Sequence, residues 1–255
     1  MNVARLYAAL NQKIPLELSC NWDNDGLMCC ADAEKEVHRV LVALDITAAV
    51  VDRAIEGKYD LIVSHHPLIF SPLSSVTVTD PIAKKVIRLL RADVAAMSFH
   101  TRLDAVQSGV NDVLAEILGL ENVEPFGFGG EAIGRIGELA NEMTLVDFAK
   151  RVKAVTGAEQ VLYSDAGLPV HRVAVLGGSG SSDVDAAKAA GADTYVTGEL
   201  KHNNLTEAPE RGMNLIAGGH FHTENPVCER IADLLREIDA TLTVDVINSN
   251  TVCVL

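Results

Sequence analysis

The chain has 255 residues, 48% of them hydrophobic, which is enough for one large core or two smaller lobes. Its formal net charge of −14 opposes binding to phosphate backbones and argues against nucleic-acid polymers as partners. Neither a signal peptide nor an apolar run of membrane-spanning length is recognisable, and the five cysteines form no CxxC motif, so we expect a cytoplasmic protein with no membrane partner.

Buried strands and amphipathic helices alternate along the chain, which predicts βαβ units and an α/β fold. Charged or imidazole side chains come soon after several strands, where ligand sites of parallel sheets lie. We expect strands at 39–46, 59–66, 94–101, 213–220 and 241–247, and helices at 47–57, 80–92, 108–120, 144–157 and 225–238. The Gly-rich stretch 124–139 is typical of turns.

An internal repeat divides the chain. Residues 37–65 align without a gap with residues 170–198 at an offset of 133, and ten of the 29 positions are identical. This pattern predicts two linked α/β lobes with related βαβ cores. We place residues 1–125 together with 213–255 in the first lobe and residues 126–212 in the second.

Three imidazoles and two carboxylates stand out as candidate metal ligands because all of them follow predicted strands. Such a set suits Zn, Fe, Mn, Co or Ni better than Ca or Mg, which prefer oxygen ligands. Five ligands exceed the need of one catalytic zinc ion, so two divalent ions fit the set better. The predicted ligands are His65, His66, Asp104, His220 and Glu224.

His65 and His66 are adjacent, so in an extended chain their rings would point to opposite faces. A shared role requires irregular backbone or two different partners, and one ion for each histidine satisfies the second condition.

Other polar motifs leave alternatives open. His100, His202 and His222 are candidates for proton transfer or substrate contact, or are ordinary surface residues. The sequence GGSGSS at 177–182 could hold a phosphate on its backbone N–H groups at Gly178, Ser179 and Gly180, or form a tight βα turn. The motif NWDNDGL at 21–27 contains the only tryptophan and indicates an ordered turn, with a role in lining a site as the alternative.

These motifs together resemble the dinuclear-metal-centre hexameric family related to the yeast Ngg-interacting factor, whose members are often called GTP cyclohydrolase 1 type 2 homologues. The resemblance covers nearly the whole chain. It rests, in order, on WDNDGL, SHHPLIF, HTRLD, GRIGEL, GGSGSS, TGELKH and GGHFHTE.

The resemblance implies a fold of two α/β lobes with the metal site in the cleft between them, and a toroidal homohexamer. It implies the same five metal ligands, with Glu224 bridging two ions. Arg102 and His222 depart from the family pattern, which suggests a more basic pocket mouth and makes Arg102 a candidate substrate-binding residue.

Three functions remain open. The first is a metal-dependent hydrolase or cyclohydrolase acting on a nucleotide-like or heterocyclic small molecule. The alternative is a non-catalytic metal carrier, insertion factor or metal-regulated interaction protein, and a purely structural metal site is the third reading. The sequence contains no motif that identifies a substrate.

Overall fold

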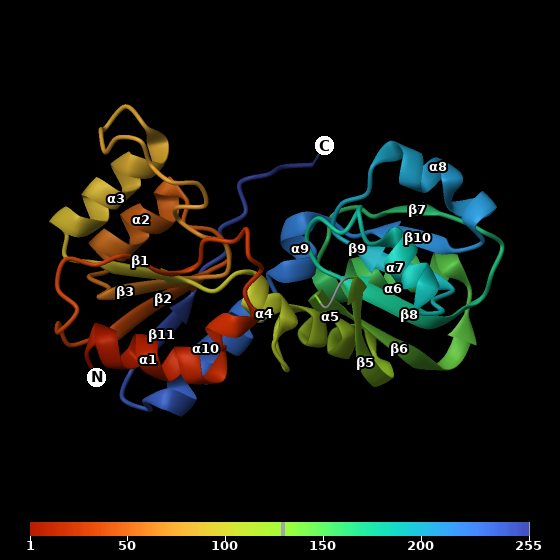
Figure 1. Ribbon diagram of the computed structural model, residues 1–255, viewed down its shortest axis with the longest axis horizontal. Helices are drawn as coiled ribbons and strands as arrows, with labels where there is room; N and C mark the ends of the chain where they lie inside the picture. The colour runs from red at the N-terminus through yellow and green to blue at the C-terminus, as the bar shows by residue number, and fades with distance from the viewer. Residues whose placement is uncertain (129–130, 255) are drawn as a thin grey trace. The chain divides into compact units, whose positions relative to one another are not determined.

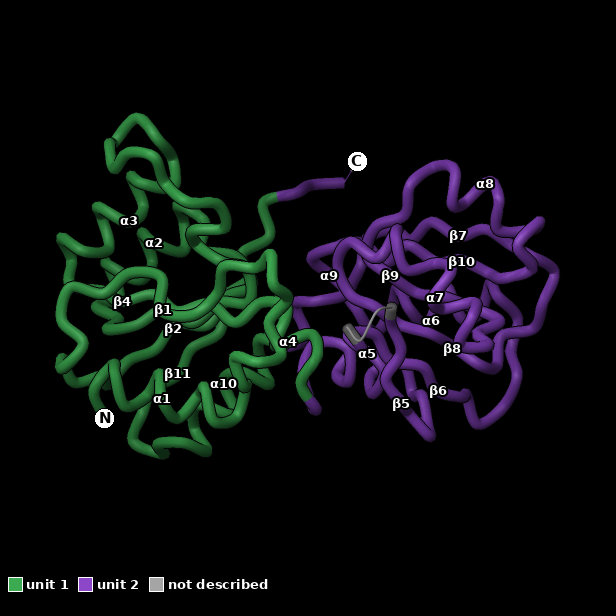
Figure 2. Tube along the Cα trace, viewed as in Figure 1, with its two compact units in different colours: residues 1–106, 228–251 green, residues 107–227, 252–255 purple. Residues whose placement is uncertain are grey.

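The computed structural model describes residues 1–128 and 131–254, which form two compact units (Figures 1 and 2). Unit 1 consists of residues 1–106 and 228–251, and unit 2 of residues 107–227 together with the last residues from Val252 on. The expected α/β class with two lobes is confirmed.

The predicted lobe boundaries were wrong at both ends of unit 2. Residues 107–125 and 213–227 belong to unit 2, although they were assigned to the first lobe. The reason is strand pairing, because strand β5 (Leu120–Phe128) pairs with strand β6 (Glu131–Met143), and strand β10 (Asn214–Ala217) pairs with β9 (Thr194–Thr197).

Unit 1 is a five-stranded sheet in the order β1-β4-β3-β2-β11, parallel except for the edge strand β1. Its strands are β1 (Gly26–Cys29), β2 (Arg39–Ala43), β3 (Leu61–Ser64), β4 (Ala95–Ser98) and β11 (Thr243–Val246). Its helices are α1 (Val3–Lys13), the 3-10 turn η1 (Leu16–Leu18), α2 (Ala48–Glu56), α3 (Pro81–Arg91), α4 (Thr101–Ala105) and α10 (Val227–Ile238), of which α10 begins at the boundary with unit 2.

Helices cover both faces of the unit 1 sheet, with α2 and α3 on one side and α1 and α10 on the other (Figure 1). The core beneath α2 and α3 includes Leu41, Ile62 and Ala96, which are in register on neighbouring strands. Alternate strand residues point to the opposite face. Burial on both faces explains why these strands are continuous apolar runs in the sequence.

Unit 2 is a six-stranded mixed sheet in the order β5-β6-β8-β9-β10-β7, whose three strands β8, β9 and β10 are parallel. The two strands not yet described are β7 (Leu162–Ser164) and β8 (Val170–Leu176). The helices are α5 (Val110–Leu118), α6 (Leu145–Thr156), α7 (Val184–Ala189), α8 (His202–Arg211) and α9 (His220–Glu224). One core packs α5 and α6 against the sheet, and a second packs α7 and α8 against it.

The described residues of the stretch 124–139 belong to strands β5 and β6, whereas its glycines had predicted turns. Two of these glycines permit close approach between β5 and β6. A Cβ at Gly134 would lie 2.6 Å from Cζ of Phe126, and one at Gly137 would lie 2.8 Å from the carbonyl oxygen of Glu121. Gly129 and Gly130, which belong to the same stretch, lie outside the described residues.

The internal repeat is visible in the strand registers. Val40 pairs with Leu61 in unit 1, and Val173 pairs with Thr194 in unit 2, so the offset of 133 holds for both partners. The Asp60 carboxylate accepts the backbone N–H groups of residues 38 and 39, and Asp193 accepts those of residues 171 and 172. The related βαβ cores are therefore confirmed.

The repeat extends further than the sequence alignment. In each unit a third parallel strand of four residues is followed after two residues by a five-residue helix, β4 and α4 in unit 1, β10 and α9 in unit 2. The constant offset here is 119 residues, so Thr101 corresponds to His220. Both short helices carry candidate ligands, Asp104 on α4 and His220 and Glu224 on α9.

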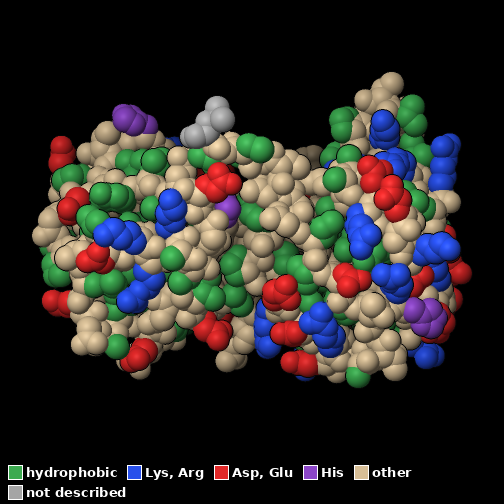
Figure 3. Space-filling view, turned by 180° about the vertical axis from the view of Figure 1, so that it is seen from behind, with side chains coloured by type: hydrophobic (Ala, Val, Ile, Leu, Met, Phe, Trp, Pro, Cys, Tyr) green, Lys and Arg blue, Asp and Glu red, His purple; other side chains and the backbone are tan. Residues whose placement is uncertain are grey.

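No helix among the described residues combines the length and apolar character needed to cross a membrane. On the face shown in Figure 3, Lys and Arg side chains are interspersed with Asp and Glu side chains.

Candidate metal centre

His65 and His66 leave the end of β3 with their rings close together. The backbone bends at both residues, while the N–H of His66 still donates to the carbonyl oxygen of Leu44 at 3.0 Å. The ring centroids are 4.9 Å apart, with an interplanar angle of 41°. Irregular backbone after the strand thus brings the two neighbours to one place.

His100 joins them from the segment between β4 and α4. Its ring centroid is 5.3 Å from that of His65 and 5.7 Å from that of His66. The three residues offer ring nitrogens that lie within 4.8 Å of one another, a spacing that could hold a metal ion. Asp104 on α4 is buried, and its Oδ1 is 3.7 Å from Nε2 of His65.

Each imidazole of this cluster is held through Nδ1 by an oxygen. Nδ1 of His65 bonds the carbonyl oxygen of Phe99 at 2.9 Å. Nδ1 of His66 bonds Oδ1 of Asp45 at 2.7 Å, and Nδ1 of His100 bonds Oδ1 of Asp23 at 2.8 Å. Carbonyl and carboxylate oxygens can only accept hydrogen bonds, so Nδ1 of each ring carries the proton. Nε2 then has a free lone pair with which it could bind a metal ion.

Unit 2 contributes a second group on α9. His220 and Glu224 are its first and last residues, one turn apart and therefore on the same face. Nε2 of His220 lies 3.1 Å from Oε2 of Glu224, and its Nδ1 bonds Oε1 of Glu199 at 3.1 Å. His220 therefore resembles the histidines of unit 1, because an oxygen also binds its Nδ1.

Two glycines make room for α9. A Cβ at Gly178 would overlap with Oε1 of Glu224, and a Cβ at Gly198 would lie 2.8 Å from Cα of His220. Gly198 is the repeat counterpart of His65, so a side chain at this position is excluded in unit 2.

The loop at 177–182 supports α9 and does not form an open phosphate cradle. The N–H of Gly178 donates to Oγ1 of Thr223 at 3.1 Å, and that of Gly180 donates to Oγ1 of Thr197 at 3.0 Å. The substrate-binding prediction was therefore wrong for these two backbone donors. Ser179 is exposed and remains untested.

The prediction that Arg102 contacts substrate at a pocket mouth was also wrong, because the side chain is fully buried inside unit 1. Nε of Arg102 donates to Asp25 at 2.9 Å, and Nη1 donates to Oδ1 of Asn11 at 2.6 Å. The guanidinium also lies 4.5 Å from the centre of the Phe99 ring. Arg102 ties the 21–27 turn to α4.

His202 and His222 differ from His100 in their surroundings. His202 is exposed at the first position of α8, and the ring of His222 packs edge-on against Phe221. Among the described residues, neither belongs to a group spaced to hold a metal ion.

Three carboxylates that hold the histidine rings of these groups were not identified as site residues from the sequence: Asp23, Asp45 and Glu199. The available signals were weak, since Asp45 follows a strand and Glu199 is the repeat counterpart of His66. Burial alone would raise the pKa of Asp23, but hydrogen bonds from His100 and Thr101 outweigh it and hold the pKa below its usual value.

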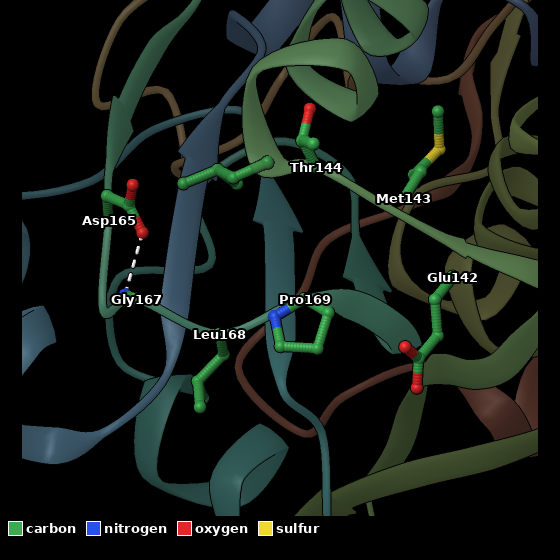
Figure 4. Close-up of a pocket in the computed structure, with 8 residues that line it drawn as sticks. Glu142, Met143, Thr144, Asp165, Gly167, Leu168 and Pro169 are labelled. Carbon is green, nitrogen blue, oxygen red and sulfur yellow. Dashed lines mark hydrogen bonds between the residues drawn. The ribbon is translucent and has the colours of Figure 1, made fainter.

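A separate pocket of about 470 Å³ lies on unit 2 (Figure 4). It contains no imidazole, and its two acidic side chains include Asp165, whose carboxylate accepts the N–H of Gly167. None of the predicted site residues lines it. The lining residues are Glu142, Met143, Thr144, Leu145, Asp165, Gly167, Leu168 and Pro169.

The fold and these two groups of side chains define a two-unit α/β protein with imidazole and carboxylate groups that could bind metal. Residues 1–252 match the family model described as Duf34/NIF3 (NGG1p interacting factor 3). The chain belongs to this family.

Relatives and solved structures agree with this assignment. The chain is 35% identical over 228 residues to the "GTP cyclohydrolase 1 type 2 homolog" of Clostridium perfringens, covering 88% of this chain and 87% of the relative. It is 33% identical over 250 residues to the "Protein NIF3 homolog" of Schizosaccharomyces pombe, with 89% of each chain covered. The crystal structure of Staphylococcus aureus protein SA1388 superposes with a TM-score of 0.90 at 28% identity, covering 100% of this chain and 99% of that chain.

Proposed function

We propose that this protein is a metal-dependent hydrolase or cyclohydrolase that acts on a nucleotide-like or heterocyclic small molecule. The observation that carries the metal part is the Nδ1 hydrogen-bond partner of His65, His66 and His220, which prepares Nε2 of each ring as a ligand atom. The name of the bacterial relatives, "GTP cyclohydrolase 1 type 2 homolog", supports the reaction class.

The donor set fits a divalent transition metal or zinc, because imidazole nitrogen is mixed with carboxylate oxygen. We propose that these ligands would hold two divalent ions, with Glu224 as the carboxylate that both ions would share. When bound, such ions supply Lewis-acid chemistry, since they polarise a substrate oxygen and lower the pKa of water. The proposed ligands are His65, His66, Asp104, His220 and Glu224.

Among the residues of this chain, His100 is the best placed to move a proton. Its Nδ1 proton is held by Asp23, so Nε2 is the basic atom that would accept a proton. The neighbouring Asp23 carboxylate stabilises the imidazolium that forms. Asp45 holds the His66 ring in the same manner and keeps its Nε2 orientation fixed.

Metal analysis of Glu224→Ala tests the ligand assignment. We expect the variant, purified beside the wild type, to lose at least one metal ion per chain. Glu229→Ala on α10 is the matched control and should keep the wild-type content. Full metal occupancy in Glu224→Ala would disprove the bridging role.

A turnover screen tests the reaction. Metal-loaded protein is incubated with nucleotides and pterin-like heterocycles, with His66→Ala as the inactive control. The partly exposed His66 and His220 side chains favour exchange of the ions and keep a metal carrier as the alternative. Absence of turnover combined with metal transfer to an apoprotein would favour that carrier.

We also propose that the protein is a cytoplasmic homohexamer, as the family resemblance implies. Light scattering coupled to size-exclusion chromatography measures the mass in solution, and a mass other than six chains contradicts the hexamer.

A further inference from the structure

Two large aromatic side chains stand exposed beside the histidine cluster of unit 1. Trp22 is 60% exposed and Phe70 is 51% exposed. Their ring centroids are 6.2 Å apart, with an interplanar angle of 66°. The His100 ring lies 6.2 Å from Trp22 and 6.0 Å from Phe70 and is edge-on to both.

The turn that carries Trp22 is fixed, so its exposure does not come from a loose loop. The Asp23 side chain accepts the backbone N–H of Thr101 at 3.0 Å and its hydroxyl at 2.6 Å. The side-chain amide of Asn24 donates to the carbonyl oxygen of Ile69, next to Phe70. These bonds link the two segments that carry Trp22 and Phe70 and hold their backbones in place before any ligand binds.

The size of this surface fits a small molecule better than a protein. An aromatic side chain buries at most about 150 to 250 Å². Two of them fall far short of the roughly 1,200 Å² that a stable protein interface buries. The tilted pair forms a corner that offers the face of one ring and the edge of the other, which suits one flat ring system.

We infer that Trp22 and Phe70 form a stacking platform for a planar heteroaromatic ring, of the purine or pteridine kind. A ring stacked there contacts His100 at its edge, and His100 contacts both His65 and His66. The inference deepens the proposed function, because it names the part of the substrate that this site recognises. Binding of this heteroaromatic ring can be measured whether or not the protein converts it to a product.

Trp22 is the only tryptophan of the chain, so its fluorescence reports on the platform directly. Metal-loaded protein is titrated with guanosine, which has the ring and lacks phosphate, and in parallel with tripolyphosphate, which has phosphate and lacks the ring. We expect saturable quenching of Trp22 by guanosine and little change with tripolyphosphate. Elemental analysis of the same samples reports the metal content independently.

The variants separate stacking from other causes of quenching. Phe70→Ala should weaken guanosine binding about ten-fold, because loss of one stacking ring typically has an effect of this size. Phe70→Tyr should bind within about two-fold of the wild type, since the aromatic face is retained. Both variants should keep the wild-type metal content and thermal stability.

Three outcomes would overturn the platform. The first is that guanosine does not quench Trp22 fluorescence in protein that holds its metal. This result would leave the metal part of the proposed function intact. The second is equal affinity of Phe70→Ala and the wild type. The third is a Trp22 spectrum that changes with protein concentration without guanosine, because the pair is then covered by a second copy of the chain. Loss of metal from the wild type would instead count against the proposed function.

Discussion

The hydrogen-bond partner of each histidine Nδ1 influences how strongly the opposite atom, Nε2, can bind a metal ion or a proton. His65 uses a carbonyl oxygen, whereas His66 and His100 use carboxylates, which are the stronger acceptors for a protonated Nδ1. A carboxylate partner raises the basicity of the ring and so strengthens the bond from Nε2 to a metal ion. The side chains behind the ligands therefore influence metal affinity without touching the metal.

Asp45→Ala tests this influence. We expect metal affinity to fall about 10- to 100-fold, because the His66 ring loses its acceptor and its fixed orientation. Competition with a chelator measures the affinity. Asp233→Ala, an exposed position on α10, is the control, and equal affinity in Asp45→Ala and the control would contradict the role of Asp45.

Strand ends and short helices position these residues. In both units the ligand-bearing segments follow parallel strands, and the repeat places α4 and α9 at equivalent positions. The ligands themselves differ, because His66 corresponds to Glu199, and Glu199 holds the ring of His220 instead of serving as a proposed ligand. One position of the repeat thus has two functions.

Gly198→Ala probes the space beside α9. Its Cβ would lie 2.5 Å from the carbonyl oxygen of Gly178, so backbone must move. We expect a loss of about 1 to 3 kcal/mol in the free energy of unfolding, as for an overpacked core. Urea denaturation measures it, with Ser179→Ala as the exposed control in the adjoining loop. An unchanged unfolding midpoint would show that the backbone at Gly178 moves aside without a loss of stability.

Asp60 links the start of β3 to β2 and gives unit 1 a pH-dependent contribution. Burial alone raises the pKa of Asp60, but the N–H groups of His38 and Arg39, with Lys35 nearby, more than offset this and hold the pKa below its usual value. Because the folded pKa is lowered, the stabilisation is present at neutral pH and is lost as the pH falls below about 4.

We expect Asp60→Ala to lower the free energy of unfolding by about 1.5 to 3 kcal/mol at neutral pH, the typical contribution of hydrogen bonds to a charged group. The difference from the wild type should shrink in acid. Urea denaturation at several pH values measures both. A difference that stays constant from neutral pH to acid would rule out the carboxylate as its source.

At the scale of the whole molecule, the sequence predicted the α/β class and the repeat because strand periodicity and composition are local signals. It did not predict the unit boundaries, because the apolar strand 214–217 has the same composition whichever sheet it joins. It also failed for Arg102, whose burial depends on Asp25 and Asn11 far away in the sequence. The proposed ligands were found from their position after strands, while the residues behind them needed three-dimensional contacts.

The unit boundaries predict how fragments behave. All six strands of the unit 2 sheet lie between residues 107 and 227, so we expect this fragment to fold alone and to unfold cooperatively. Residues 1–106 lack β11 and α10, so this fragment should aggregate. Circular dichroism and thermal unfolding measure both. A fragment 107–227 without a cooperative transition contradicts the division.

The position of β11 has a consequence for synthesis on the ribosome. Strand β2 lies between β3 and β11, so its outer edge stays open until residues 243–246 have emerged. At typical translation rates the delay after residue 106 is on the order of ten seconds. During that time the nascent chain exposes an unpaired strand edge, which is a template for aggregation. Chaperone dependence of the newly made chain is therefore expected to arise in unit 1, while unit 2 can fold as soon as its last strand is free.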